Sequence, residues 1–297
     1  MRARARRGAG SRVSRAVECE GSPRDLGRDQ GRACADALRE RFARLELGAR
    51  LRLRLGRLGG SGLALRRELS RHFPRQAETL AGMSVAAGVP AAWLAACLES
   101  ECAGGPEEIA GAAGGEVTRS GAVVARALGG EWIVRRSRPE GAFRSVEVTR
   151  PWLAHALLGV NEAGLAVAVV TPDLRGRFAA LPAAPLALDC LQRFATLEAC
   201  LEWCASRPGE RPAALLFADA AGEVAGIEIA PGRRRLLRSA EGWLAAGGSS
   251  AAREEMGKAL RESGGLAGDP RSPHAGALAF ADPEDRSLRL GPERYAV

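Results

Sequence analysis

A turn at residues 161–164, followed at once by a valine-rich run, constrains the fold more than any other stretch of this sequence. Asn161-Glu162-Ala163-Gly164 is short and polar, and apolar runs stand on both sides of it, the second at residues 165–170. Short apolar runs rich in β-branched residues and bounded by turn residues are typical of buried strands. Gly164 suits the turn because glycine adopts a left-handed backbone that other residues tolerate poorly. We therefore expect a tight turn that leads into a central, buried strand at residues 165–170.

Length and composition indicate a globular chain with a substantial core. The chain has 297 residues, of which 46% are hydrophobic, and no run approaches the ~18 consecutive apolar residues of a membrane span. The formal net charge of +8 is the one feature that points toward nucleic acid. However, the positive charge is nearly all arginine interleaved with acidic residues, and a single tyrosine offers no stacking platform. We therefore expect neither a nucleic-acid partner nor a membrane partner.

Cysteine usage indicates a reducing, cytoplasmic setting. The seven cysteines are Cys19, Cys34, Cys97, Cys102, Cys190, Cys200 and Cys204. None forms a CxxC pair, the count is odd, and the basic start of the chain has no apolar segment of a secretory signal. Cys200 and Cys204 lack further ligands at metal spacing, so we expect no metal, no cofactor, and thiols that act mostly as small buried hydrophobes.

Helical patterns dominate the first third of the chain and strand patterns the rest. Expected helices cover residues 23–45, 75–87, 91–99, 185–205 and 253–262. Expected strands cover residues 17–20, 121–127, 145–149, 165–171, 213–218, 223–229, 234–238, 243–246, 278–280 and 288–290. Residues 50–55 alternate Arg and Leu, which fits a strand or a helix with snorkelling arginines, and the Gly- and Ala-rich residues 102–115 are expected to form a loop. This order favours antiparallel sheets with helices packed outside them, an α+β layered fold.

Four stretches spread over the chain share a pattern with one enzyme family. They are residues 21–31, residues 80–89, the turn at 159–165 and a hairpin at 213–229 built around Asp219-Ala220-Ala221-Gly222. Together with the closing residues 282–292, they resemble the isopenicillin N acyltransferase (penicillin acyltransferase) family of N-terminal-nucleophile (Ntn) hydrolases. The stretch at 159–165 also looks like the bile-salt-hydrolase branch of that superfamily.

The resemblance implies a fold and a domain organisation. It implies an Ntn-hydrolase-like four-layer αββα sandwich of antiparallel sheets flanked by helices. Residues 16–297 would form a single domain, with a mainly helical, propeptide-like part at 16–105 and a sheet-rich part at 106–297. Residues 1–15 are expected to be a disordered basic tail.

The resemblance also implies a chemistry. In that superfamily the chain cuts itself before a Cys, Ser or Thr, and the new terminal residue attacks an amide with its own α-amine as base. The carbonyl oxygen becomes negative in the transition state and needs fixed donors. The resemblance assigns such a donor to Asn161 and the arginine beside the nucleophile to Arg126, and it implies a small amide or acyl thioester as substrate. On the sequence pattern alone, the favoured explanation of Asn161 is a side chain that caps its own turn.

The nucleophile is absent from its expected place. It should begin the strand that pairs with the strand carrying Arg126, about 12–17 positions earlier. Residues 109–114 occupy that interval and are Ile, Ala, Gly, Ala, Ala and Gly, none of which attacks a carbonyl. Cys102 remains a possible nucleophile after a longer loop, whereas Thr118 is too close to Arg126. The family's Asp three residues after the arginine is Gly129 here, and its Thr-Asn-His type segment is replaced at residues 246–250.

Three hypotheses about function follow. The first is an amidase or acyltransferase that uses Cys102, and the second is a catalytically inactive relative that keeps the fold and a small-molecule cleft. The third, a cysteine or serine hydrolase with a separate histidine base, is the least favoured, because none of His72, His155 and His274 lies in a recognised nucleophile motif. Whether the chain is an enzyme, its substrate and its oligomeric state stay open in the sequence. We expect one uncut chain that forms no acyl-enzyme.

Overall fold

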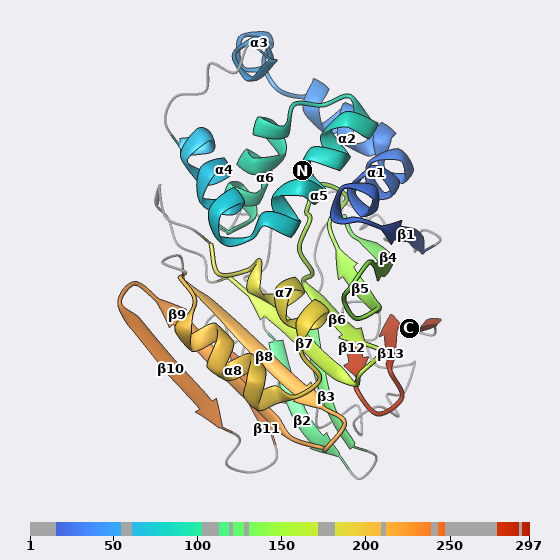
Figure 1. The fold of residues 1–297 in the computed structure, drawn as a ribbon, viewed down its shortest axis with the longest axis vertical. Coiled ribbons are helices and arrows are strands. Elements are labelled where there is room, and N and C mark those ends of the chain that lie inside the picture. Colours follow the sequence, from blue (N-terminus) through green and yellow to red (C-terminus); the bar gives the residue numbers. More distant parts are fainter. Residues whose placement is uncertain are drawn as a thin grey trace, which may run out of the picture.

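The computed structural model describes most of the chain as a mixed α+β protein (Figure 1). The described residues are 16–54, 61–102, 113–118, 121–127, 131–171, 182–208, 212–238, 243–246, 278–290 and 293–297. The expected tail at 1–15 and the expected helix at 253–262 lie outside them. Within this part of the chain, no helix is long and apolar enough to cross a membrane.

The larger sheet has eight strands in the order β1-β4-β5-β6-β7-β8-β9-β10. Their bounds are β1 Val17–Gly21, β4 Ile133–Pro139, β5 Ser145–Thr149, β6 Leu158–Asn161, β7 Leu165–Val170, β8 Ala213–Asp219, β9 Val224–Ala230 and β10 Arg233–Arg238. All neighbours are antiparallel except β1, which pairs in parallel with β4. Every residue of β7 is buried, and the strand is fifth of eight. The expectation of a central, buried strand after the turn is confirmed.

The smaller sheet has six strands in the order β11-β2-β3-β12-β13-β14. Their bounds are β2 Ala113–Thr118, β3 Gly121–Ala127, β11 Trp243–Ala246, β12 Leu278–Asp282, β13 Ser287–Leu290 and β14 Glu293–Ala296. The two sheets share a core of small apolar side chains. In β7, residues 166, 168 and 170 belong to that inter-sheet core, while residues 165, 167 and 169 face the helix side. The period of two along β7 thus fills two cores at once.

Helices cover the outer face and one end of the larger sheet. On its face, α7 (Leu186–Arg193) packs against β6 and β7, and α8 (Leu197–Ser206) packs against β8 and β9. The other six helices of the described residues gather at one end of the molecule in Figure 1. They are α1 Pro23–Ala33, α2 Ala35–Ala43, α3 Leu47–Arg54, α4 Ser61–His72, α5 Pro74–Ala87 and α6 Ala91–Cys102. The α+β class is confirmed, whereas a fourth, helical layer over the smaller sheet stays a prediction.

Two of the stretches that carry the family resemblance form one tightly packed helix pair. A Cβ added at Gly27 of α1 would lie 2.0 Å from the Thr79 carbonyl oxygen of α5, and one added at Gly82 of α5 would lie 2.1 Å from the Arg24 carbonyl oxygen. Only glycine permits this backbone approach. These glycines therefore serve the contact between α1 and α5.

The strands β2 and β4 were not expected, for different physical reasons. β2 begins within residues 102–115, which were expected to form a loop because they are rich in Gly and Ala. In the structure, Gly115 serves the packing between the two sheets. A Cβ at Gly115 would come within 2.5 Å of the Val224 side chain in the facing sheet. β4 carries three arginines, which are unusual in a buried strand, and the buried side chain of Arg135 forms an ion pair with Glu147.

Other elements differ from the expectation in their extent. The expected helix at 23–45 is interrupted at Cys34. Of the two alternatives for residues 50–55, the structure has the helix, since residues 50–54 belong to α3. The short strands β6 and β14 and the helix α4 were not expected either. β6 precedes the turn at Asn161 and has only four residues, which is too short for a period of two to be recognised.

Candidate functional site

The first residue of β2 occupies the place where a nucleophile is expected. Ala113 lies opposite Arg126 of β3 on one side and opposite Ala246 of β11 on the other. It falls within the interval 109–114 that strand lengths predict, and residues 109–112 lie outside the described part of the chain. The Ala113 side chain is a fully buried methyl group. At this position the chain offers no atom that attacks a carbonyl.

Arg126 lies near the end of β3, with its side chain almost fully buried. Its neighbour on the other side is Ala279 of β12. The Arg126 charge contributes to lowering the pKa of His155, a residue in the connection between β5 and β6 of the other sheet. Arg126 therefore marks an end of the sandwich where both sheets contribute polar groups.

His155 is neutral in the folded protein. Its side chain is 1% exposed. Burial is the main cause that lowers its pKa to about 3, and the charges of Arg126 and Arg135 add to it. Its Nε2 atom is buried and has no hydrogen-bond partner in the described structure, while its main-chain oxygen accepts a 2.6 Å hydrogen bond from Thr149 Oγ1. In the sequence, no local motif or spacing links His155 to Arg126.

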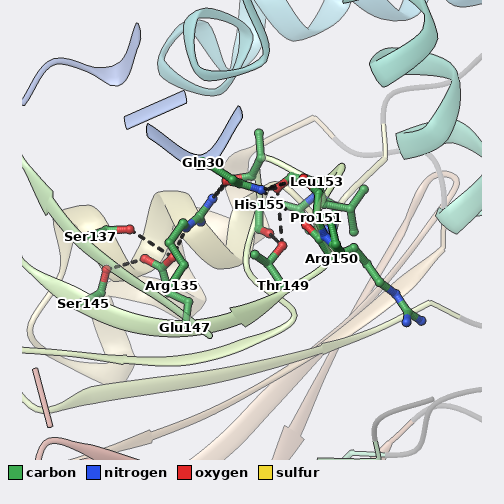
Figure 2. Close-up of polar contacts among 11 residues, drawn as sticks. Gln30, Arg135, Ser137, Ser145, Glu147, Thr149, Arg150, Pro151, Leu153 and His155 are labelled. Atoms are coloured by element: carbon green, nitrogen blue, oxygen red, sulfur yellow. Dashed lines mark hydrogen bonds and ion pairs between the residues drawn. The ribbon is translucent and has the colours of Figure 1, made fainter. Parts of the chain in front are cut away.

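A buried ion pair lies beneath the segment that carries His155 (Figure 2). Arg135 Nε donates to Glu147 Oε2 at 2.5 Å, and the two side chains are 3% and 0% exposed. The hydroxyls of Ser137 and Ser145 donate to the two oxygens of the same carboxylate. The Glu147 carboxylate thus accepts hydrogen bonds from three side chains, and its role is structural.

Gln30 of α1 connects this ion pair to the loop at residues 150–155 (Figure 2). Its Oε1 accepts from Arg135 at 2.7 Å. Its Nε2 faces the carbonyl oxygens of Arg150, Pro151 and Leu153 at 3.3, 3.1 and 2.9 Å. Because an amide nitrogen has two hydrogens, these three contacts are shared. The helix α1 therefore fixes the loop from which His155 projects.

Asn161 lies elsewhere in the sandwich. Its Nδ2 donates to the carbonyl oxygens of Leu191 and Phe194, both at 2.8 Å, and its Oδ1 accepts from Ala163 N at 3.1 Å and Leu165 N at 2.9 Å. The side chain closes its own turn and attaches that turn to α7. The role of Asn161 as an oxyanion donor stays a prediction. In this conformation, both hydrogens of its amide group are already donated to main-chain oxygens.

The turn that contains Asn161 and the end that contains Arg126 are separated along β12. A Cβ at Gly164 would lie 3.0 Å from the Pro283 carbonyl oxygen, so the turn adjoins the end of β12. Arg126 is opposite Ala279, four residues earlier, which corresponds to ~13 Å along a strand. The structure does not bring Asn161 and Arg126 together.

Cys102 is the last residue of α6. Its side chain and the following residues 103–112 lie outside the described part, so its role as a nucleophile stays a prediction. In the described ranges, no group of three or more His, Cys, Asp or Glu side chains is arranged to hold a metal ion.

Comparison with known proteins gives partial structural likeness. No protein-family model matches the sequence, and no curated protein matches it. A mutant of conjugated bile acid hydrolase from Clostridium perfringens is 13% identical, with a TM-score of 0.33 over 45% of this chain and 52% of that chain. Penicillin V acylase from Agrobacterium tumefaciens is 20% identical, with a TM-score of 0.30 over 46% and 49%. The Caenorhabditis elegans ortholog of N-acylethanolamine-hydrolyzing acid amidase is 11% identical, with a TM-score of 0.43 over 58% and 93%.

All three TM-scores are below 0.5, so these likenesses carry no conclusion about the family or activity of this chain. The chain matches about half the length of the bile acid hydrolase and of the penicillin V acylase. The chain is thus only distantly similar in structure to parts of these three proteins. The similarity is too partial to assign an activity.

Proposed function

We propose that this chain is a non-catalytic protein of the Ntn-hydrolase type, which resembles penicillin acyltransferase-type amidases but neither cleaves itself nor forms an acyl-enzyme. The observation that carries the proposal is the position of Ala113, the first residue of β2, directly opposite Arg126. In the mechanism implied by the resemblance, this residue supplies both the attacking atom and, after the cut, the α-amine that takes its proton. A methyl group supplies no attacking atom.

Thr118 and Asn161 do not restore the chemistry that Ala113 lacks. Thr118 is the last residue of β2 and pairs with Gly121, so it lies five residues, or ~16 Å, along the strand from Ala113. Asn161 uses both amide hydrogens within the fold, so the expected oxyanion donor is also committed elsewhere. The methyl group at Ala113 and the hydrogen-bonded amide of Asn161 both support the proposal.

The role that fits this arrangement is binding without turnover. The end of the sandwich near Ala113 keeps a buried arginine, Arg126, and a neutral imidazole, His155. A small amide offers a carbonyl oxygen and an N–H group for contacts with these polar side chains, and an acyl thioester offers the carbonyl oxygen. We propose small amides or acyl thioesters as the ligand class, with cytoplasmic localisation and no nucleic-acid or membrane partner.

The test is a search for an acyl adduct. The purified protein is incubated with a simple acyl thioester and with a chromogenic anilide, and intact mass and product release are followed. We expect neither an adduct nor turnover in the parent, in Cys102→Ala, or in Cys97→Ala, which removes a buried thiol of the same helix. An adduct that Cys102→Ala abolishes and Cys97→Ala preserves would overturn the proposal and support an active amidase or acyltransferase.

A further inference from the structure

Three thiols meet between the two helices that cover the larger sheet. Cys190 belongs to α7, and Cys200 and Cys204 belong to α8. All three side chains are fully buried. The Sγ atoms of Cys190 and Cys204 are 3.6 Å apart, and Cys200 also contacts the Cys190 thiol. The cluster is separate from the end of the sandwich that contains Arg126.

Two features of the sequence bring these thiols together. They are the spacing of the two cysteines on α8 and the short link between α7 and α8. Cys200 and Cys204 are four residues apart, so they share one face of the helix. Only residues 194–196 separate α7 from α8, which keeps the two helices adjacent. A second contact joins them, since the Trp203 indole donates to Asp189 at 2.9 Å. The thiols therefore meet across a fixed helix–helix contact.

We propose that Cys190 and Cys204 form a reversible disulfide when the protein meets a peroxide, and that this bond locks α8 onto α7. A disulfide requires an S–S distance of about 2.05 Å, so the sulfurs must approach by roughly 1.5 Å from their 3.6 Å separation. Rotation of the two side chains and a small helix shift supply a movement of this size. A bond between Cys190 and Cys200 is the alternative within the cluster. Its presence or absence therefore tests whether oxidation is specific for the pair of Cys190 and Cys204.

The step balances without any further reactant. One thiolate attacks hydrogen peroxide, an S–O bond forms, the O–O bond breaks, and hydroxide leaves to become water with the thiol's proton. The second thiol then attacks the sulfenic sulfur, the S–S bond forms, and a second water leaves. Two thiols are oxidised and one peroxide is reduced to two waters. A dithiol reductant reverses the change by thiol–disulfide exchange.

Burial controls the rate of this reaction. The contact with Cys190 and desolvation raise the pKa of Cys204 well above its ordinary value, and desolvation does the same for the pKa of Cys190. Because the thiolate is the attacking species, the pair reacts during local opening of α8. The resulting bond would also affect β6 and β7, because the carbonyl oxygens of Leu191 and Phe194 at the end of α7 hold Asn161.

The experiment compares the reduced protein with the protein treated with hydrogen peroxide. We expect a loss of about 2 Da for the two hydrogens removed in forming the bond. We also expect a non-reduced peptide map that joins Cys190 to Cys204, and a melting temperature higher by roughly 5 °C or more. A dithiol should restore the starting mass. Trypsin can cleave after Arg193, which separates Cys190 from the other two thiols, and fragmentation of the α8 peptide then identifies its bonded sulfur.

The matched variants are Cys204→Ala and Cys34→Ala, which remove a buried thiol inside and outside the cluster. Cys204→Ala should abolish the bond, and Cys34→Ala should keep it. If Cys190 and Cys204 stay reduced while other thiols oxidise, or if Cys190 bonds to Cys200, the proposal is overturned. The parent's peptide map distinguishes these outcomes even if a variant fails to fold.

Discussion

Replacing Asn161 by alanine should destabilise the protein by about 4 kcal/mol, at about 1 kcal/mol for each of its hydrogen bonds. The Asn161 carboxamide makes four of them, two donated to main-chain oxygens of residues 191 and 194 and two accepted from main-chain nitrogens of its own turn. Because Asn161 is fully buried, water does not easily replace the lost partners. Urea unfolding should therefore show a midpoint lower by roughly 1–1.5 M with an unchanged slope.

Two variants separate this explanation from a general effect of mutating the turn. Glu162→Ala removes the next side chain, whose carboxylate binds Arg144 near the surface, and should cost at most about 1 kcal/mol. Asn161→Asp keeps the two accepted bonds but sets a carboxylate oxygen against two carbonyl oxygens, so it should be destabilising and should recover in acid. A loss below about 1 kcal/mol in Asn161→Ala would refute the view that this side chain holds the turn on α7.

Three further predictions test the buried polar groups and the helix contact. Because the pKa of His155 falls from 6.5 to about 3 on folding, the unfolded chain binds a proton in that window that the folded chain does not, and stability should rise with pH across it. His155→Gln should flatten the plot of unfolding free energy against pH by up to about 1.4 kcal/mol per unit; an unchanged slope would contradict this. Glu147→Gln leaves its buried guanidinium partner uncompensated and should cost about 3–5 kcal/mol in denaturant unfolding, against at most about 1 kcal/mol for the exposed-pair control Glu162→Gln. Gly27→Ala should lower the melting temperature strongly because its Cβ would overlap main-chain atoms of α5, whereas Gly48→Ala, with nothing within 4 Å, should not.

The sequence predicts those parts of the fold whose cause is local. The turn at 161–164 and the strand β7 are predictable because the turn residues and the apolar run act within ten positions of each other. The interval 109–114 follows from strand and turn lengths counted back from Arg126, which the family resemblance singles out, and Ala113 opposite Arg126 lies within it.

The parts that escape prediction depend on distant residues. The glycines in the first half of β2 resemble a loop, and only the facing Val224 explains Gly115. Arg135 on β4 resembles a surface residue until Glu147 and Gln30 are placed against it. His155 gains its low pKa from burial and from arginines on other strands, so no spacing in the sequence could indicate it.

The most direct test of the central claim is the intact mass of the purified protein. If Ala113 has replaced the nucleophile, the protein persists as one chain of 31.1 kDa after prolonged incubation under native conditions. Two fragments with a new amino terminus at Cys102, and their absence in Cys102→Ala, would contradict the account and show a self-cleaving enzyme.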